Sequence, residues 1–289
     1  MRAISTALFL VATIAACGGQ KDPFAGGPDA AHNGDGGPTD GGTDIDAAPR
    51  MCAAKPKRVV VLGDSITACS VIGGAQNADC VSKKVSDYVI ATYGATTYQN
   101  LAVGGAKLAD IQAQLDNIQP AAGPALVIMY IGGNDLSPFI FQSDQQAMAG
   151  YAMIEPMMTS VYNAVFAKLA NTTTFPDGAV LLMNTQYNPF DDCTASPYNL
   201  SPAKTALLHT FNDKVISIAN AHIQQAIVVN QHGPFLGHGH HYNVATCPFY
   251  KAGAAAWMQD TIHANPAGNV DLANVMNAGV DRLYRDCIQ

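Results

Sequence analysis

The chain has few charged residues, and the charges it has are nearly balanced in its larger part. Only 13% of its 289 residues are charged, and the net charge is −7. The first 49 residues account for −4, which leaves −3 on residues 50–289. A nearly neutral domain lacks the basic surface that attracts a phosphate backbone, which argues against a nucleic-acid partner. Beyond the N-terminus, no apolar run is long and pure enough to span a membrane.

The cysteines form no CxxC pattern, so they do not indicate a zinc site. Six cysteines remain after Cys17, and an even number in an exported chain indicates disulfides. Fifteen connectivities are possible, and the sequence does not choose among them. We favour a local loop, a link between two loops and a tie between the two ends of the domain: Cys69–Cys80, Cys193–Cys247 and Cys52–Cys287.

The N-terminus has the features of an export signal over residues 1–16. Arg2 precedes a short apolar core, and small residues precede Cys17. The segment 14–17 resembles the lipobox of bacterial lipoproteins, which implies a lipidated Cys17 and a lipid-anchored protein of the bacterial cell envelope. The alternative is an ordinary signal peptide with an incidental cysteine, and then the protein is secreted. Membrane contact is expected through this N-terminal anchor only.

Residues 17–55 are predicted to be a disordered linker. Residues 18–49 contain nine glycines, four prolines and six aspartates against one lysine. Such a segment has too little apolar surface to form a core. The folded domain is therefore expected over residues 56–289.

Short apolar runs alternate with helical periodicity across this domain, and no internal repeat is present. Strands are predicted at 59–62, 96–101, 125–131, 179–184 and 226–230, and helices at 83–93, 106–118, 148–169, from 202 and from 266. Pro156 either kinks the third helix or opens a new one. Strands that are apolar on both faces belong to a parallel sheet covered by helices. We predict a three-layer α/β/α sandwich with a mostly parallel five-stranded sheet.

The first strand ends at Gly63, and Ser65 follows. Parallel sheets place their ligands at the carboxyl ends of the strands, so Ser65 is a candidate nucleophile that needs a base, an orienting group and oxyanion donors. The segment before the last helix supplies His263 as a base and Asp260, three residues earlier, as a group that orients it. Loops after the second and third strands supply oxyanion donors at Gly105 and Asn134, with the Ser65 N–H as a third.

These four segments together resemble the SGNH (GDSL-type) hydrolases over residues 57–280. The corresponding blocks are Gly63-Asp64-Ser65, Asn100 with Gly105, Gly132-Gly133-Asn134-Asp135 and Asp260-x-x-His263. The resemblance implies Ser65 as nucleophile, His263 as base, Asp260 as its orienting partner, and Ser65, Gly105 and Asn134 as oxyanion donors. The chain departs from the family by placing proline at 266 rather than directly after the histidine. It also has two glycines in the second block, so Gly104 is an alternative donor.

Other polar residues have simpler interpretations. Asp64 is expected to bond loop amides, Asp135 to be a turn or N-cap residue, and Trp257 to belong to the core. The spacing of His232, His238, His240 and His241 matches no ligand signature. We expect these histidines to lie in a loop at the mouth of the site, and predict neither a metal nor a cofactor.

The sequence therefore predicts a serine esterase that acts on small-molecule, carbohydrate or lipid esters. Without an evident apolar lid segment, short acyl groups on water-soluble substrates are favoured. The alternative is a catalytically inactive binding lipoprotein of the cell envelope with the same fold. No oligomeric state is predicted.

Overall fold

The computed structural model describes residues 52–196 and 198–287. The expected export segment 1–16, Cys17 and residues 18–51 of the expected linker lie outside the described residues. Among the residues it does describe, no helix combines the length and the apolarity needed to cross a membrane.

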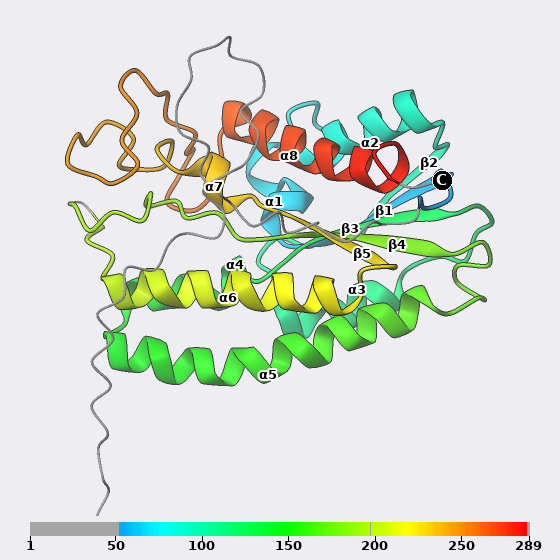
Figure 1. Cartoon of the computed structure of the whole chain (residues 1–289), viewed down its shortest axis with the longest axis horizontal. Helices are drawn as coiled ribbons and strands as arrows, with labels where there is room; N and C mark the ends of the chain where they lie inside the picture. Colours follow the sequence, from blue (N-terminus) through cyan, green and yellow to red (C-terminus); the bar gives the residue numbers. More distant parts are fainter. Residues whose placement is uncertain (1–51, 197, 288–289) are drawn as a thin grey trace, which may run out of the picture.

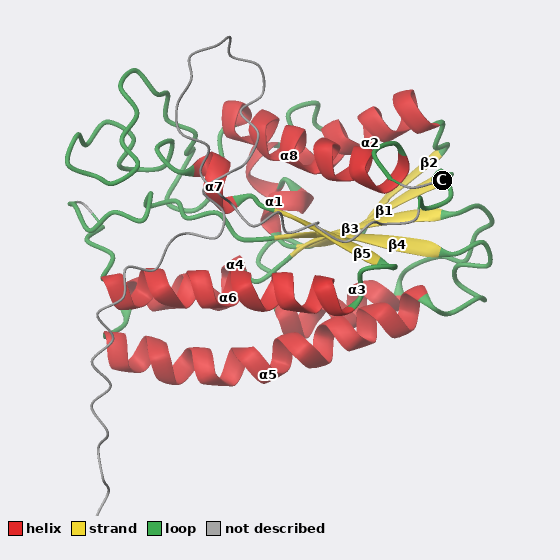
Figure 2. Ribbon diagram, in the orientation of Figure 1, coloured by secondary structure: helices red, strands yellow, loops and turns green. Residues whose placement is uncertain are grey.

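The centre of the fold is a sheet of parallel strands (Figures 1 and 2). The strands are β1 (Arg58–Gly63), β2 (Thr97–Asn100), β3 (Ala125–Tyr130), β4 (Ala179–Asn184) and β5 (Ala226–Val229). Their order across the sheet is β2-β1-β3-β4-β5. The chain leaves β1 toward one edge and returns to β3 on its other side, so the carboxyl ends of β1 and β3 form the switch point where such sheets bind ligands.

Helices cover both faces of the sheet and complete the predicted three layers (Figure 1). One face carries α2 (Val81–Tyr93) and α8 (Pro266–Tyr284), and the other carries α3 (Ile111–Asp116), α5 (Asp144–Leu169) and α6 (Pro202–Ala221). Alternate residues of a strand point to opposite faces. In β1, Val59 and Val61 accordingly pack in the cluster with α2 and α8, whereas Val60 and Leu62 pack with α3, α5 and α6.

Capping residues fix the starts of two helices as the sequence predicts. Ser201 accepts a hydrogen bond from the Lys204 N–H before Pro202, and Asn265 accepts one from the Gly268 N–H before Pro266. Helix α5 continues through Pro156, so the proline does not open a new helix.

Several short elements are absent from the sequence prediction. The helix expected at 106–118 is a 3₁₀ turn, η2 (Leu108–Asp110), followed by α3. The others are α1 (Ser65–Ala68), η1 (Ser70–Ile72), α4 (Gly133–Leu136), η3 (Ser137–Phe141) and α7 (His232–Phe235). A single turn has too few residues to show helical periodicity, so tertiary contacts decide whether it forms.

Three disulfides link the cysteines of the domain in the pairs favoured from the sequence: Cys52–Cys287, Cys69–Cys80 and Cys193–Cys247. The first joins the ends of the described chain across 235 residues of sequence. The last connects the loop after β4 to the segment after α7. Closing a loop lowers the entropy of the unfolded chain, so these bonds stabilise the fold, and Cys193–Cys247 ties together two of the segments that follow β4 and β5.

Candidate active site

Gly63 ends β1 where no other residue fits. Its φ of +141° is a conformation that favours glycine, and a Cβ atom there would lie 2.2 Å from the Tyr130 carbonyl oxygen on β3. The tight approach of the two strands brings the next residues, Asp64 and Ser65, to the switch point of the sheet.

Buried Gln114 of α3 holds this turn in place, a role that sequence reasoning missed. Its side-chain oxygen accepts a hydrogen bond from the Gly63 N–H, and its side-chain nitrogen donates to the Gly63 carbonyl, both at 2.8 Å. The pairing satisfies both backbone groups of a residue at the end of its strand. A lone glutamine in an amphipathic helix carries no sequence signal for such a contact.

Ser65, His263 and Asp260 form one hydrogen-bonded chain, as the sequence predicts. The Ser65 Oγ lies 2.9 Å from His263 Nε2, and His263 Nδ1 lies 2.8 Å from Asp260 Oδ2. Because Nδ1 donates to the carboxylate, Nε2 is left as the acceptor for the serine hydroxyl. The serine and the histidine are 198 positions apart in the sequence, and the fold brings them together.

The loop that carries Asp260 and His263 is fixed by its own backbone. Asp260 Oδ1 accepts hydrogen bonds from the backbone N–H groups of Ile262 and His263 at 3.0 and 2.9 Å. A β-bridge pairs Met258 with Ala264, and the Tyr187 hydroxyl donates to the Ile262 carbonyl. Because Pro266 begins α8 at the end of this loop, the displaced proline leaves the Asp260–His263 spacing intact.

The carboxylate of Asp260 is more open to solvent than its partners. Its side chain is 47% exposed, against 15% for His263. Partial burial would raise the pKa of Asp260, but the hydrogen bonds from Ile262 N–H, His263 N–H and the His263 ring outweigh it and lower the pKa. Asp260 is therefore ionised at neutral pH and able to stabilise an imidazolium.

A hydrogen bond from Asn134 to Ala106, the residue after Gly105, brings two proposed oxyanion donors close together. The Asn134 side-chain nitrogen donates one hydrogen bond to the Ala106 carbonyl at 3.0 Å and keeps a second N–H for a ligand. Gly105 precedes Ala106 with a φ of +80° and open space where a side chain would be. A Cβ at Gly104 would instead lie 2.9 Å from Ser70 Oγ and 3.2 Å from Ser70 Cβ, so a larger residue there would displace the Ser70 side chain.

A cavity opens beside Ser65, His263 and Asn134, all three of which line it. Its remaining wall is largely apolar and comes from α4, η3, α6 and the segments after β4 and before α6, chiefly through Leu136, Phe139, Ile140, Leu200, Leu207 and Leu208. About 750 Å³ of it is free of protein atoms when the part open to solvent is included. Gly105 is not among the residues that line the cavity.

Asp64 lies directly before the serine and is buried. It caps α1 by accepting a hydrogen bond from the Ile66 N–H, the structural role expected of it. Burial, with a smaller contribution from the negative charge of Asp135, raises the pKa of Asp64 to about 7.

We expect Asp64→Asn to make the protein more stable than the parent at pH 7 and above. The folded-state pKa of about 7 exceeds the ordinary value of 3.8, so the folded chain holds this proton more tightly than the unfolded chain. The parent therefore loses stability as the pH rises from about 4 to about 7, by at most about 4 kcal/mol. Asparagine retains the oxygen that caps α1 without the buried charge.

Urea unfolding of both proteins between pH 4 and pH 8 measures this difference, with exposed Asp116→Asn as the matched control. The advantage of Asp64→Asn should grow with pH, while the control follows the parent. An advantage that is the same at every pH would contradict the buried charge as its cause.

Asp135, Trp257 and the four histidines considered in the sequence make no hydrogen bond to Ser65 or His263 among the described residues. Asp135 is in α4 rather than at its N-cap, and its carboxylate accepts a hydrogen bond from the Leu108 N–H at 3.0 Å. Trp257 stacks on His238 with 3.6 Å between ring centroids. None of the four histidines is among the residues that line the cavity. Their position in a loop at the mouth of the site stays a prediction. Hydrogen bonds tie three of them to backbone carbonyls: His238, His240 and His241.

Comparisons with known proteins agree with this fold. A family model described as GDSL-like lipase/acylhydrolase matches residues 59–276. No curated protein sequence matches the chain.

Solved structures share the fold at low sequence identity. An extracellular lipase from Streptomyces rimosus has a TM-score of 0.50 at 19% identity, covering 77% of this chain and 99% of its own. An acetylxylan esterase from Geobacillus stearothermophilus has a TM-score of 0.50 at 16% identity, covering 78% and 94%. An α/β hydrolase enzyme from the metagenome of Lake Arreo, Spain, has a TM-score of 0.52 at 19% identity, covering 81% and 99%.

Proposed function

The chain belongs to the GDSL-like lipase/acylhydrolase family and is a carboxylic ester hydrolase, and from that premise we propose that it works through an acyl-enzyme on Ser65. The observation that carries the proposal is the hydrogen-bonded chain from Ser65 through His263 to Asp260. A nucleophile, its base and the group that orients the base are already in contact, which is the arrangement that serine hydrolysis requires. This intact set also argues against the inactive binding protein considered from the sequence.

The reaction follows from these contacts. His263 Nε2 removes the hydroxyl proton as Ser65 Oγ attacks the ester carbonyl carbon. The tetrahedral intermediate collapses when the carbon–oxygen bond to the alcohol breaks, and His263 returns the proton to the departing alkoxide. Water, deprotonated by His263, then attacks the acyl-enzyme and releases the carboxylic acid and Ser65.

The oxyanion of each intermediate needs donors that are already in place. The first N–H groups of a helix have no partner within the helix, and Ser65 is the first residue of α1. Asn134 adds the side-chain N–H that it does not use on Ala106. Gly105, one residue before Ala106, is the third donor in this proposal.

The acyl group that the enzyme accepts is an apolar chain longer than acetyl. The sequence favours short acyl groups because no apolar lid is evident, but the cavity beside Ser65 has a wall of leucine, isoleucine and phenylalanine side chains. Each methylene transferred from water to such a wall contributes about 0.8 kcal/mol. The wall therefore favours acyl chains of several carbons over acetyl.

We expect kcat/KM on p-nitrophenyl esters to rise from acetate through butyrate to octanoate. Ile140→Trp, which fills part of the cavity, should abolish the gain beyond butyrate while acetate turnover changes little. The matched control is Phe141→Trp, because Phe141 is adjacent but 82% exposed and does not line the cavity. A parent enzyme that prefers acetate, or an Ile140→Trp profile like that of the parent, would contradict the acyl-chain assignment.

A further inference from the structure

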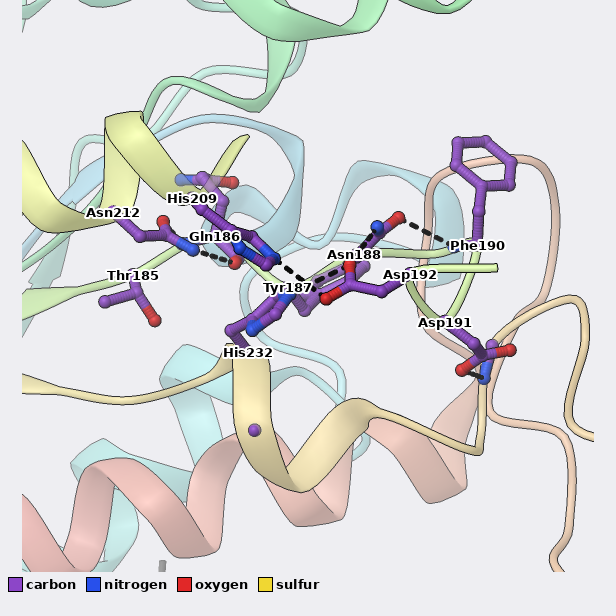
Figure 3. Close-up of polar contacts among 12 residues, drawn as sticks. Thr185, Gln186, Tyr187, Asn188, Phe190, Asp191, Asp192, His209, Asn212 and His232 are labelled. Atoms are coloured by element: carbon purple, nitrogen blue, oxygen red, sulfur yellow. Dashed lines mark hydrogen bonds and ion pairs between the residues drawn. The ribbon is translucent and has the colours of Figure 1, made fainter. Parts of the chain in front are cut away.

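Three side chains from distant parts of the sequence lie close together, apart from Ser65, His263 and Asp260. They lie next to Asn188, which lines the cavity. His209 lies on α6, His232 begins α7, and Asp192 lies in the segment after β4. His209 Nε2 is 2.8 Å from Asp192 Oδ2, and His232 Nε2 is 3.2 Å from Asp192 Oδ1. Figure 3 shows both imidazoles directed at the same carboxylate.

The geometry points to a binding site for a zinc-class transition-metal ion on Asp192, His209 and His232. One ligand atom from each residue lies within 4.8 Å of the others. Ligands held about 2.1 Å from a tetrahedral ion are about 3.4 Å from one another, so small side-chain movements would accommodate the ion. Two imidazoles and a carboxylate are ligands that suit zinc.

Residues around Asp192, His209 and His232 hold these side chains in position. Asn188 donates a hydrogen bond of 2.5 Å to Asp192 Oδ1, and hydrogen bonds of this kind orient the ligands of metal sites. The neighbouring Asp191 points away from the two imidazoles (Figure 3). Its carboxylate accepts hydrogen bonds from the backbone N–H groups of Gly237, Gly239 and His241. His209 is 32% exposed and leaves a path for the ion and a solvent ligand.

Charge explains why a cation would stabilise this cluster. The side chains of Asp192 and His232 are only 7% and 1% exposed. The Asp192 carboxylate already lies within hydrogen-bond distance of side-chain nitrogens of Asn188, His209 and His232. A buried carboxylate needs a positive partner, which a divalent ion supplies when both imidazoles are neutral.

Sequence spacing misses this site because the three ligands are 17 and 23 residues apart. Only His232 belongs to the histidine cluster visible in the sequence. A second group, Cys193, His241 and Cys247, carries no such proposal because both sulfurs form a disulfide. The metal site borders the cavity through Asn188 and is independent of the proposed esterase mechanism.

Calorimetric titration of chelator-treated protein tests the site. We expect one Zn²⁺ per chain, no binding of Mg²⁺ or Ca²⁺, and an affinity for Zn²⁺ at least about 100-fold lower in His209→Gln. Asn188→Ala should weaken binding by about tenfold. The matched control is His238→Gln. His238 is not one of the three proposed ligands, so this variant should bind Zn²⁺ like the parent.

Thermal melting provides a readout that does not depend on activity. Zn²⁺ at about 100 times its dissociation constant should raise the Tm of the parent by about 5 °C and that of His209→Gln by much less. His209→Gln is the main variant because its partly exposed helical position tolerates glutamine, and its metal-free Tm checks that the fold is retained. Absence of Zn²⁺ binding to the parent, or equal binding by His209→Gln, would overturn the proposal.

Discussion

Ser65→Ala is expected to lower kcat for ester hydrolysis by at least about 10⁴-fold while the protein remains folded. The hydroxyl lies 2.9 Å from His263 Nε2, and no other hydroxyl in the described structure is bonded to that nitrogen. His263→Ala should cause a loss of similar size, because the serine then lacks its base. The double variant should lose little more, since nucleophile and base act in the same step.

Steady-state kinetics on p-nitrophenyl butyrate measure these losses, with exposed Ser70→Ala as the control that should retain parent activity. A fluorophosphonate probe gives a second readout, because it forms a bond to the activated serine oxygen as fluoride leaves. The parent should be labelled on the peptide that contains Ser65, and Ser65→Ala should not be labelled. Hydrolysis by Ser65→Ala at the parent rate would refute the assignment of the nucleophile.

Asp260→Asn should be less damaging than the loss of a buried orienting aspartate, for which about 10⁴-fold is typical. Asparagine retains an oxygen for the N–H groups of Ile262 and His263, so the loop is maintained. Its NH₂ group cannot accept the hydrogen bond that Oδ2 accepts from His263 Nδ1, so activity falls. The loss is limited because the retained oxygen at the Oδ1 position lies 2.9 Å from the same nitrogen, and because solvent already screens this 47% exposed carboxylate. We expect a loss of about 10²-fold in the same assay.

The sequence predicted the layers of this fold well because β1, β3, β4 and β5 are apolar on both faces and each long helix has a periodic apolar stripe. The edge strand β2 is polar and no residue of it is buried, so the alternation around it predicted it rather than its own composition. It also predicted that Ser65, His263 and Asp260 converge, because four short motifs occur in order at strand ends and before the last helix. It did not predict Gln114 or the cluster of Asp192, His209 and His232. Their contacts join residues far apart along the chain, and a single polar side chain has no periodicity from which such contacts follow.

Helices of a single turn were also not predicted from the sequence, because they are too short to show periodicity. Helices α1 and α4 each have four residues, and both hold proposed site residues, Ser65 and Asn134. Propensity is a weak guide over one turn. In the structure, contacts with other segments fix both turns: Ser82 and Asn100 donate to the Thr67 carbonyl of α1, and side chains of α4 bond the backbone of Ala106 and Leu108. Even the role of Asp135 depended on Leu108, 27 residues earlier.

Gly63→Ala is expected to destabilise the fold by about 3–5 kcal/mol, because a methyl group has no room at this position. The new Cβ would lie 2.2 Å from the Tyr130 carbonyl oxygen and 2.5 Å from Thr67 Oγ1, and the φ of +141° is unfavourable for alanine. The strand cannot easily move away, since Gln114 holds both backbone groups of Gly63 and six residues of β1 pair with β3.

Urea unfolding distinguishes this steric cost from the general cost of a positive φ. The matched variant is Gly94→Ala, where φ is +76° but no atom lies within 4 Å of the added Cβ. That variant should lose only about 1–2 kcal/mol. Gly63→Ala should also lower kcat by about 10²-fold, because any relaxation of the turn displaces Ser65 from His263. Equal destabilisation by the two variants would show that β1 and β3 can move apart to accommodate the methyl group. Close packing of these strands would then not fix the position of the serine.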